Sequence, residues 1–231
     1  MKANAKQICV DDIKLRILTM DLQPGYPLDE IQLAKHYTLS RTPLREVIQR
    51  LSGEGYVVVE ENRGAKVASL DLAALRHFFQ AAPMIYASVA RLAAEKATPS
   101  DIAALQSIQD TFRAALAKAD PAEAAYQNHL FHAQIGDMAD SPYLTPSLNR
   151  LLIDHTRIAQ MFYRTDTSDD EQRIAEAVDQ HDAMILAFTE RDAPQAVELT
   201  LEHWNLSRGL IERFVSPDPL PFETESFANA V

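Results

Sequence analysis

The sequence has one cysteine and no long apolar run. Cys9 has no partner for an intrachain disulfide bond, which is typical of proteins from a reducing compartment. No apolar stretch approaches the roughly 20 residues that a membrane-spanning helix needs. The first 14 residues also lack the apolar segment of a signal peptide. We therefore expect a cytoplasmic protein that does not bind a membrane.

Basic residues are also scarce. The 231-residue chain has 22 Lys and Arg against 33 Asp and Glu, and its net charge of −11 argues at first against nucleic-acid binding. The deficit is uneven, however, because residues 1–70 hold ten basic and nine acidic side chains, whereas the remaining 161 hold twelve and 24. A locally basic segment joined to an acidic one is typical of a DNA-binding module with a partner domain.

The first 70 residues predict a compact pattern of helices and a hairpin. Asp29 and Ser40 are good N-caps, the prolines and glycine of LQPGYPL predict a turn, and two β-branched runs flank a polar turn with glycine. The expected elements are helices over 6–21, 29–36 and 41–53, a turn at 22–28, and strands over 56–60 and 65–70. In the helix at 29–36 we expect Ile31, Leu33 and Ala34 to point inward.

After Asp71 the sequence is rich in Ala and Leu, has helical periodicity and contains no convincing strand. Prolines and capping residues, among them Asp120 and Ser141, punctuate it near the expected helix starts. The expected helices lie near 71–97, 99–119, 122–138, 142–163, 169–191 and 193–214. Residues 216–231 contain three prolines and little periodicity, which predicts a flexible tail.

We therefore expect a mostly α protein with two domains. Residues 6–70 would form a helix-rich N-terminal domain with a small β-hairpin, and residues 71–215 an all-α helical bundle.

The segment 41–53 has two distinct faces. Its apolar residues recur at helical spacing and should pack inward: they are Leu44, Val47, Ile48 and Leu51. Arg41, Arg45 and Gln49 form a stripe on another face, with Thr42 beside it. Arginine can donate two parallel hydrogen bonds to guanine, and threonine or glutamine can meet other base edges or phosphates.

Neighbouring residues extend this candidate DNA-binding surface. Ser40 and the first-turn amides can bind a phosphate, and the hairpin tip Asn62-Arg63-Gly64 can reach the adjacent backbone or the minor groove. The alternative is a solvated basic face on a helical hairpin.

Residues 8–70 resemble the winged helix-turn-helix of GntR-type regulators. The most specific motifs, all present in order, are PG-x-x-L-x-E, L-A, S-R-T-P-L-R-E, R-L-x-x-E-G and N-R-G-A-x-V. The resemblance implies a homodimer on a pseudo-palindromic site in double-stranded operator DNA. It implies DNA contacts from Ser40, Arg41, Thr42, Arg45, Arg63 and Gly64. Ile31 stands about where some relatives carry a basic residue.

Three of the seven histidines stand out in the expected helical bundle. His132, His181 and His203 lie on three separate expected helices, so all three can point into one core. Neutral imidazoles that converge suit Zn²⁺ or another borderline divalent ion. Asn128 lies one turn before His132 and faces the same way, so its amide oxygen can add a weak ligand. The alternative is that each histidine is structural or solvated.

Residues 71–215 resemble the ligand-sensing helical (FCD) domain of the FadR subfamily of GntR regulators. The resemblance rests on N-H-L-F-H, followed by His181 and His203 on later helices. It implies a divalent ion, Zn²⁺ or alternatively Ni²⁺ or Mn²⁺, held by His132, His181 and His203 with position 128 as fourth ligand. That ion would coordinate a small carboxylate effector or play a structural role.

Two departures from the family pattern concern this site. Asn128 stands where Asp is common, which removes a negative charge and lowers the expected metal affinity. Gln80-Ala81-Ala82-Pro83-Met84-Ile85-Tyr86 replaces a segment in which relatives often carry Arg and Glu. We expect effector contacts from Tyr86 and, as replacements for the missing arginine, from Arg157 and Tyr163. A solvated face is the alternative for Arg157 and Tyr163.

Three functions fit these patterns. The first is a transcription repressor whose operator affinity is controlled by an organic acid bound in the metal-containing domain. The second is a regulator for which the divalent ion itself is the signal. The third is a metal-dependent hydrolase, because three histidines with an open position can activate water. The sequence offers no positioned general base and the N-terminal domain would stay unexplained, so we expect a regulator and not an enzyme.

Overall fold

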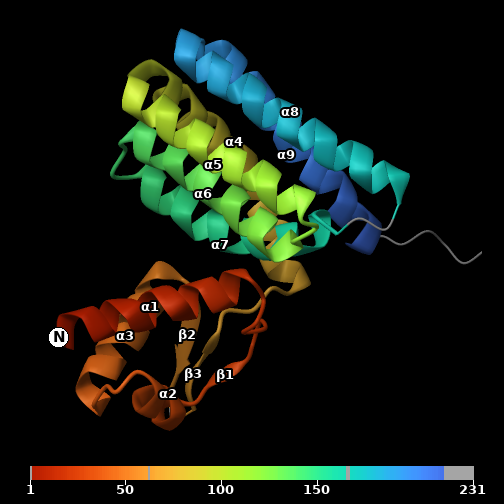
Figure 1. Ribbon diagram of the computed structural model, residues 1–231. Coiled ribbons are helices and arrows are strands. Elements are labelled where there is room, and N and C mark those ends of the chain that lie inside the picture. Colours follow the sequence, from red (N-terminus) through yellow and green to blue (C-terminus); the bar gives the residue numbers. More distant parts are fainter. Residues whose placement is uncertain (1, 62, 165–166, 216–231) are drawn as a thin grey trace, which may run out of the picture.

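The computed structural model describes residues 2–61, 63–164 and 167–215. The chain in these ranges is largely helical with one small sheet near the N-terminus, which confirms the mostly α prediction (Figure 1). Asn62 of the predicted hairpin tip and the predicted tail at 216–231 lie outside the described residues. Within those ranges no helix is both long enough and apolar enough to cross a bilayer.

The N-terminal part combines helices with an antiparallel sheet of strand order β1-β3-β2. Its elements are α1 (Lys2–Leu18), β1 (Pro27–Leu28), α2 (Glu30–His36), α3 (Arg41–Glu54), β2 (Val57–Glu60) and β3 (Gly64–Val67). The expected helices and hairpin are present, but 22–28 is not only a turn, because β1 pairs with β3 through Pro27 opposite Lys66. Pro27 is tolerated there because β1 is an edge strand.

Local chemistry explains where the short helices begin and end. The Asp29 carboxylate accepts hydrogen bonds from the amides of Ile31 and Gln32 at 2.9 and 3.1 Å, as expected for an N-cap. Gly55 ends α3 in the left-handed region with φ +90°, where glycine is favoured. The expectation that Ile31 points inward was wrong, since its side chain is 79% exposed. A helix of seven residues buries only a narrow stripe, here through Leu33 and Ala34.

In the described part of the chain after β3 there are six helices, close to the expected ranges. They are α4 (Leu72–Lys96), α5 (Pro99–Ala117), α6 (Pro121–Ala139), α7 (Leu144–Phe162), α8 (Ser168–Glu190) and α9 (Ala193–Val215). Asp120 caps α6 as expected, accepting from the Glu123 amide at 3.0 Å. Ser141 is not the N-cap of α7, which begins after Tyr143, although its hydroxyl accepts from the Leu144 amide.

Helix α7 has two buried faces, which point to different parts of the protein. One face packs inside the helical bundle: Leu148, Leu152, His155, Ala159 and Phe162. The opposite face meets the N-terminal part, next to α1 (Figure 1). There Ile153 is fully buried in the N-terminal core, and the Gln160 amide donates to the Leu18 carbonyl at 3.0 Å. This one helix therefore contacts both halves of the protein.

The guanidinium of Arg157 fixes the linker between β3 and α4. It donates to the carbonyl oxygens of Ala68 at 2.7 Å and Ser69 at 3.3 Å, and it pairs with the Asp154 carboxylate. Arg157 is only 1% exposed, so it does not lie on a solvated face. Its charge is buried with these oxygens as partners, and the linker is held against α7.

We predict that Arg157→Met destabilises the protein by about 3–5 kcal/mol, because it removes the buried partner of Asp154 and the donor to the linker carbonyls. Arg150→Met is the matched control. Arg150 lies on the same helix and 3.6 Å from the same carboxylate, but its side chain is 49% exposed. Its loss should cost less than about 1 kcal/mol. Urea unfolding followed by circular dichroism measures both, and equal costs would contradict the assignment.

Candidate functional site

The exposed face of α3 carries the predicted DNA-contacting side chains. Arg41, Thr42, Arg45 and Gln49 are exposed, while the apolar stripe of the helix is buried. Among the described residues, neither arginine of this face has an ion pair or a side-chain hydrogen bond. These guanidinium groups are therefore free to bind phosphates or base edges.

The other side of α3 is occupied by contacts to α1. Arg50 donates to Gln7 at 2.9 Å and pairs with Glu54, and Glu46 pairs with Lys6. The hydrogen bond to Gln7 and the ion pair with Lys6 hold α3 against α1, so this side of the helix is structural and the opposite side is exposed.

The remaining predicted contact residues flank this face. Ser40 is exposed and makes no side-chain capping bond, which leaves its hydroxyl available. Arg63 and Gly64 are exposed at the start of β3, and Gly64 has φ +80°, a conformation that glycine adopts without strain. These positions form the edge of the predicted surface that would approach the backbone of a duplex.

In the helical bundle three histidines converge. His132 of α6, His181 of α8 and His203 of α9 are buried, and each offers a ring nitrogen within 4.8 Å of the others. The buried atoms His132 Nε2, His181 Nε2 and Asn128 Oδ1 have no hydrogen-bond partner among the described residues. Buried polar atoms are normally partnered, so this cluster has the donor atoms that a divalent ion requires. We call His132, His181, His203 and Asn128 the histidine site.

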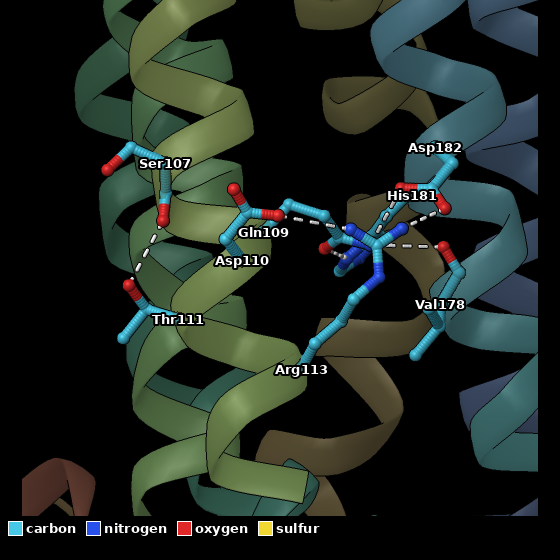
Figure 2. Close-up of polar contacts among 8 residues, drawn as sticks. All are labelled: Ser107, Gln109, Asp110, Thr111, Arg113, Val178, His181 and Asp182. Carbon is cyan, nitrogen blue, oxygen red and sulfur yellow. Dashed lines mark hydrogen bonds and ion pairs between the residues drawn. The ribbon is translucent and has the colours of Figure 1, made fainter. Parts of the chain in front are cut away.

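Two of these histidine rings are held by hydrogen bonds at their Nδ1 atoms. The Nδ1 atom of His181 lies 3.0 Å from Gln109 Oε1 (Figure 2), and that of His203 lies 3.1 Å from Gln180 Oε1. Sequence reasoning did not single out either glutamine. Gln109 was detectable in principle, since it interrupts the apolar stripe that contains Leu105 and Phe112.

Burial keeps these imidazoles neutral. Desolvation, followed by repulsion from neighbouring histidines, lowers the pKa of His132 and His181 well below the ordinary value of 6.5. Desolvation also lowers the pKa of His203 to about 4 and that of His155 to about 3. At neutral pH each ring therefore has one unprotonated nitrogen with a lone pair, which is the form that binds metal.

A fourth histidine that the sequence left unassigned lies beside the site. His155 of α7 accepts or donates a 2.7 Å hydrogen bond between its Nδ1 and the Tyr86 hydroxyl, and its ring centroid lies 5.2 Å from that of His132. Tyr86, an expected effector contact, lies 5.5 Å from His132 by the same measure. Trp204 packs against Tyr86 and Phe78, as expected of a core residue.

The other two expected effector contacts lie elsewhere. Arg157 points to the linker carbonyls on the far face of α7. Tyr163 packs against Phe112 with ring centroids 5.4 Å apart, and Phe112 separates it from His181. The structure therefore brings one of the three candidates, Tyr86, next to the histidine site.

Comparison with known proteins identifies both halves of the chain. The family model of the FCD domain matches residues 77–206, and that of bacterial regulatory proteins, gntR family, matches residues 5–67. The chain is 34% identical over 84 residues to the Nta operon transcriptional regulator of Aminobacter aminovorans, covering 36% of this chain and 40% of that protein.

Two further comparisons extend over more of the chain. It is 26% identical over 153 residues to the HTH-type transcriptional repressor RspR of Escherichia coli, covering 64% of this chain and 67% of that one. Its fold resembles the solved structure of E. coli McbR/YncC, with a TM-score of 0.77 and 20% identity over 91% of this chain and 98% of the other.

We predict that Arg45→Ala weakens binding to a selected duplex by about 1–3 kcal/mol, roughly 5- to 150-fold, because a free guanidinium that meets a base edge or phosphate is lost. Arg50→Ala is the control on the same helix, since its side chain is engaged by Gln7 and Glu54. Fluorescence anisotropy with a duplex enriched from random DNA by the wild-type protein measures both. Equal affinities for Arg45→Ala and wild type would contradict the assignment of the exposed face of α3 as the DNA-binding surface.

We also predict that metal-free protein loses stability as the pH falls below 6.5. The pKa of His155 is about 3 when folded and 6.5 ordinarily, so below pH 6.5 the unfolded chain binds more protons than the folded one. Each histidine with a lowered pKa reduces the free energy of unfolding by about 1.4 kcal/mol for each pH unit below 6.5. Urea unfolding in the presence of a chelator tests this. In His155→Phe the free energy of unfolding should depend less steeply on pH, by the contribution of one histidine. A free energy of unfolding that does not change between pH 6.5 and 5 would refute the prediction.

Proposed function

The chain belongs to the GntR family of bacterial regulatory proteins that carry an FCD domain, and from this premise we propose a repressor whose affinity for operator DNA is controlled by a small carboxylate bound at a metal ion. As a member of this family it is a transcriptional regulator, not an enzyme. Our proposal goes beyond the family in three respects: the protein represses transcription, it binds a metal ion, and it responds to a carboxylate effector. The relative RspR is a repressor.

The observation that carries the proposal is the set of unpartnered donor atoms in the histidine site. Three neutral imidazoles and one amide oxygen suit a borderline ion, with Zn²⁺ the first choice and Ni²⁺ or Mn²⁺ as alternatives. His132, His181, His203 and Asn128 would hold the ion. When bound, the ion supplies positive charge and a ligand position for an acid group.

The charge of the histidine site favours an anionic effector. All four donor side chains are neutral, because the Asn128 amide carries no charge and burial lowers the pKa values of the three histidines. A divalent ion would therefore keep its full charge in a buried environment, where an uncompensated charge is costly. A carboxylate offsets that cost, and it makes a small organic acid the preferred effector.

Helix α7 provides a physical connection from this site to the DNA-binding part. Its inner face brings His155 next to Tyr86 and His132. Its outer face holds the linker through Arg157. An effector that displaces Tyr86 or His155 would shift α7, and the linker at 68–69 would follow. The recognition helices of a homodimer would then no longer match the two halves of a pseudo-palindromic operator in the cytoplasm.

We predict that the zinc-loaded protein binds its selected duplex tightly and that one member of a panel of small hydroxy, keto and dicarboxylic acids weakens binding about 5- to 150-fold, the usual range of allosteric coupling. His132→Ala should bind the duplex like wild type but ignore the acid. Fluorescence anisotropy with and without each acid measures the coupling. If no acid of the panel changes the affinity for the duplex, the proposal that the protein senses a carboxylate is wrong.

Asn128→Asp is a test variant that keeps the shape of the side chain and changes its charge. It adds a negative ligand, so the protein should hold Zn²⁺ more tightly and the acid more weakly than wild type. An unchanged or stronger response to the acid would contradict the charge argument.

One observation favours a second function, in which the ion itself is the signal. The ring of Tyr86 packs against His132, that of Phe131 packs against His181, and Trp204 packs against Tyr86, so neighbouring rings support these ligand side chains without an organic ligand. In that case chelation alone would change operator affinity, with no acid present.

A further inference from the structure

Gln109 of α5 is buried behind the histidine site, with an exposed fraction of 1%. Its side-chain nitrogen donates to the Val178 carbonyl and to the Asp182 carboxylate, both at 3.1 Å. Its side-chain oxygen faces His181 Nδ1 at 3.0 Å (Figure 2). All three contacts join α5 to α8.

These contacts permit only one orientation of the amide. Both the Val178 carbonyl and the Asp182 carboxylate accept hydrogen bonds, so the group facing them must be the NH₂ of Gln109. An amide oxygen in that place would be repelled by two oxygens. The Gln109 oxygen therefore faces His181, and it can only accept.

The fixed oxygen in turn determines which nitrogen of His181 carries the proton. Because Gln109 Oε1 accepts, the neutral ring of His181 must have its hydrogen on Nδ1. Its Nε2 then carries the lone pair, and this is the buried atom that has no partner among the described residues and that lies in the histidine site. Stacking on Phe131, with centroids 4.0 Å apart and planes 14° from parallel, fixes the direction of the ring.

The arrangement continues to the protein surface. The second oxygen of Asp182 pairs with Arg113, which also lies 3.4 Å from Asp110 (Figure 2). Arg113 and Asp182 are both 43% exposed. This ion pair keeps the carboxylate in the position that orients the Gln109 amide.

We propose that Gln109 is a positioning residue for the metal centre: it locks His181 in the tautomer that presents Nε2 to the ion, and the Arg113–Asp182 pair holds Gln109 in that orientation. This rests on the metal site of the proposed function. Carboxylates and carbonyls often play this role behind metal-bound histidines, and here a side-chain amide does so because a carboxylate at position 109 would face Asp182 and Val178 O.

The test compares Zn²⁺ affinity, measured by competition with a chromogenic chelator, in wild type, Gln109→Leu and Gln109→Glu. Leucine fills similar volume but offers no acceptor, so Zn²⁺ should bind about 10- to 100-fold more weakly, as is usual when such a partner is lost. Glutamate keeps an acceptor for His181 Nδ1 but loses the donor to Val178 and Asp182, so Gln109→Glu should recover only part of the affinity. Asp182→Ala should weaken binding less than Gln109→Leu, since the Val178 carbonyl still orients the amide.

The matched control is Gln160→Leu. Gln160 is also a buried glutamine that donates to a backbone carbonyl, but it lies on the outer face of α7. The Gln160→Leu variant should be less stable than wild type but bind Zn²⁺ with the same affinity. It therefore distinguishes the loss of a positioning contact from general damage to the fold.

A second readout does not need the ion. Long-range proton–nitrogen NMR spectra of the metal-free protein should show His181 as the Nδ1–H tautomer in wild type and a mixture of tautomers in Gln109→Leu. An Nε2–H tautomer in wild type overturns the inference. So does wild-type Zn²⁺ affinity in Gln109→Leu. If the wild-type protein binds no Zn²⁺, the proposed metal centre is wrong. That failure is seen in the wild type alone, before any variant is compared, so it differs from a failure of the role assigned to Gln109.

Discussion

The buried guanidinium of Arg157 is the contact on which the relation between the two halves of this protein depends. A charge this deep is tolerated only with oxygen partners around it, and two of those partners are linker carbonyls, at Ala68 and Ser69. The same helix turns His155 toward the histidine site. One helix therefore contacts both the histidine site and the linker, and a physical connection of this kind is what the proposed ligand control of DNA binding requires.

In the histidine site, burial and hydrogen bonding have two separate effects that suit the proposed metal ion. Burial lowers the pKa of His132 and His181, so the rings stay neutral. Burial alone does not choose between the two ring nitrogens, however. That choice needs an acceptor behind the ring, and Gln109 behind His181 and Gln180 behind His203 supply it. Among the described residues, the Nε2 atoms of His132 and His181 then remain without a hydrogen-bond partner, and the ring nitrogens of the three histidines converge.

Much of the candidate site was predictable because it lies on regular helices. The α3 stripe follows from the helical period, and so does the exposure of Arg41 and Arg45. The period would also have shown that Gln109 and His155 interrupt apolar stripes of α5 and α7, and hence that they are buried. It could not show what they meet, because their partners lie 72 and 69 residues away along the chain. Arg157 was misjudged for the same reason, since its partners are backbone atoms of the distant linker.

By itself the sequence determined the type, order and approximate bounds of the helices, the fold class and which residues of α3 are buried or exposed, because caps, prolines and apolar periods act over a few residues. It also indicated the three histidines. Only the tertiary structure decided that their nitrogens converge, that Tyr86 alone of the expected effector contacts lies beside them, and that β1 completes the sheet with β3. These outcomes depend on how helices and strands distant in the chain pack together, and side-chain volumes and hydrogen-bond partners set that packing in three dimensions.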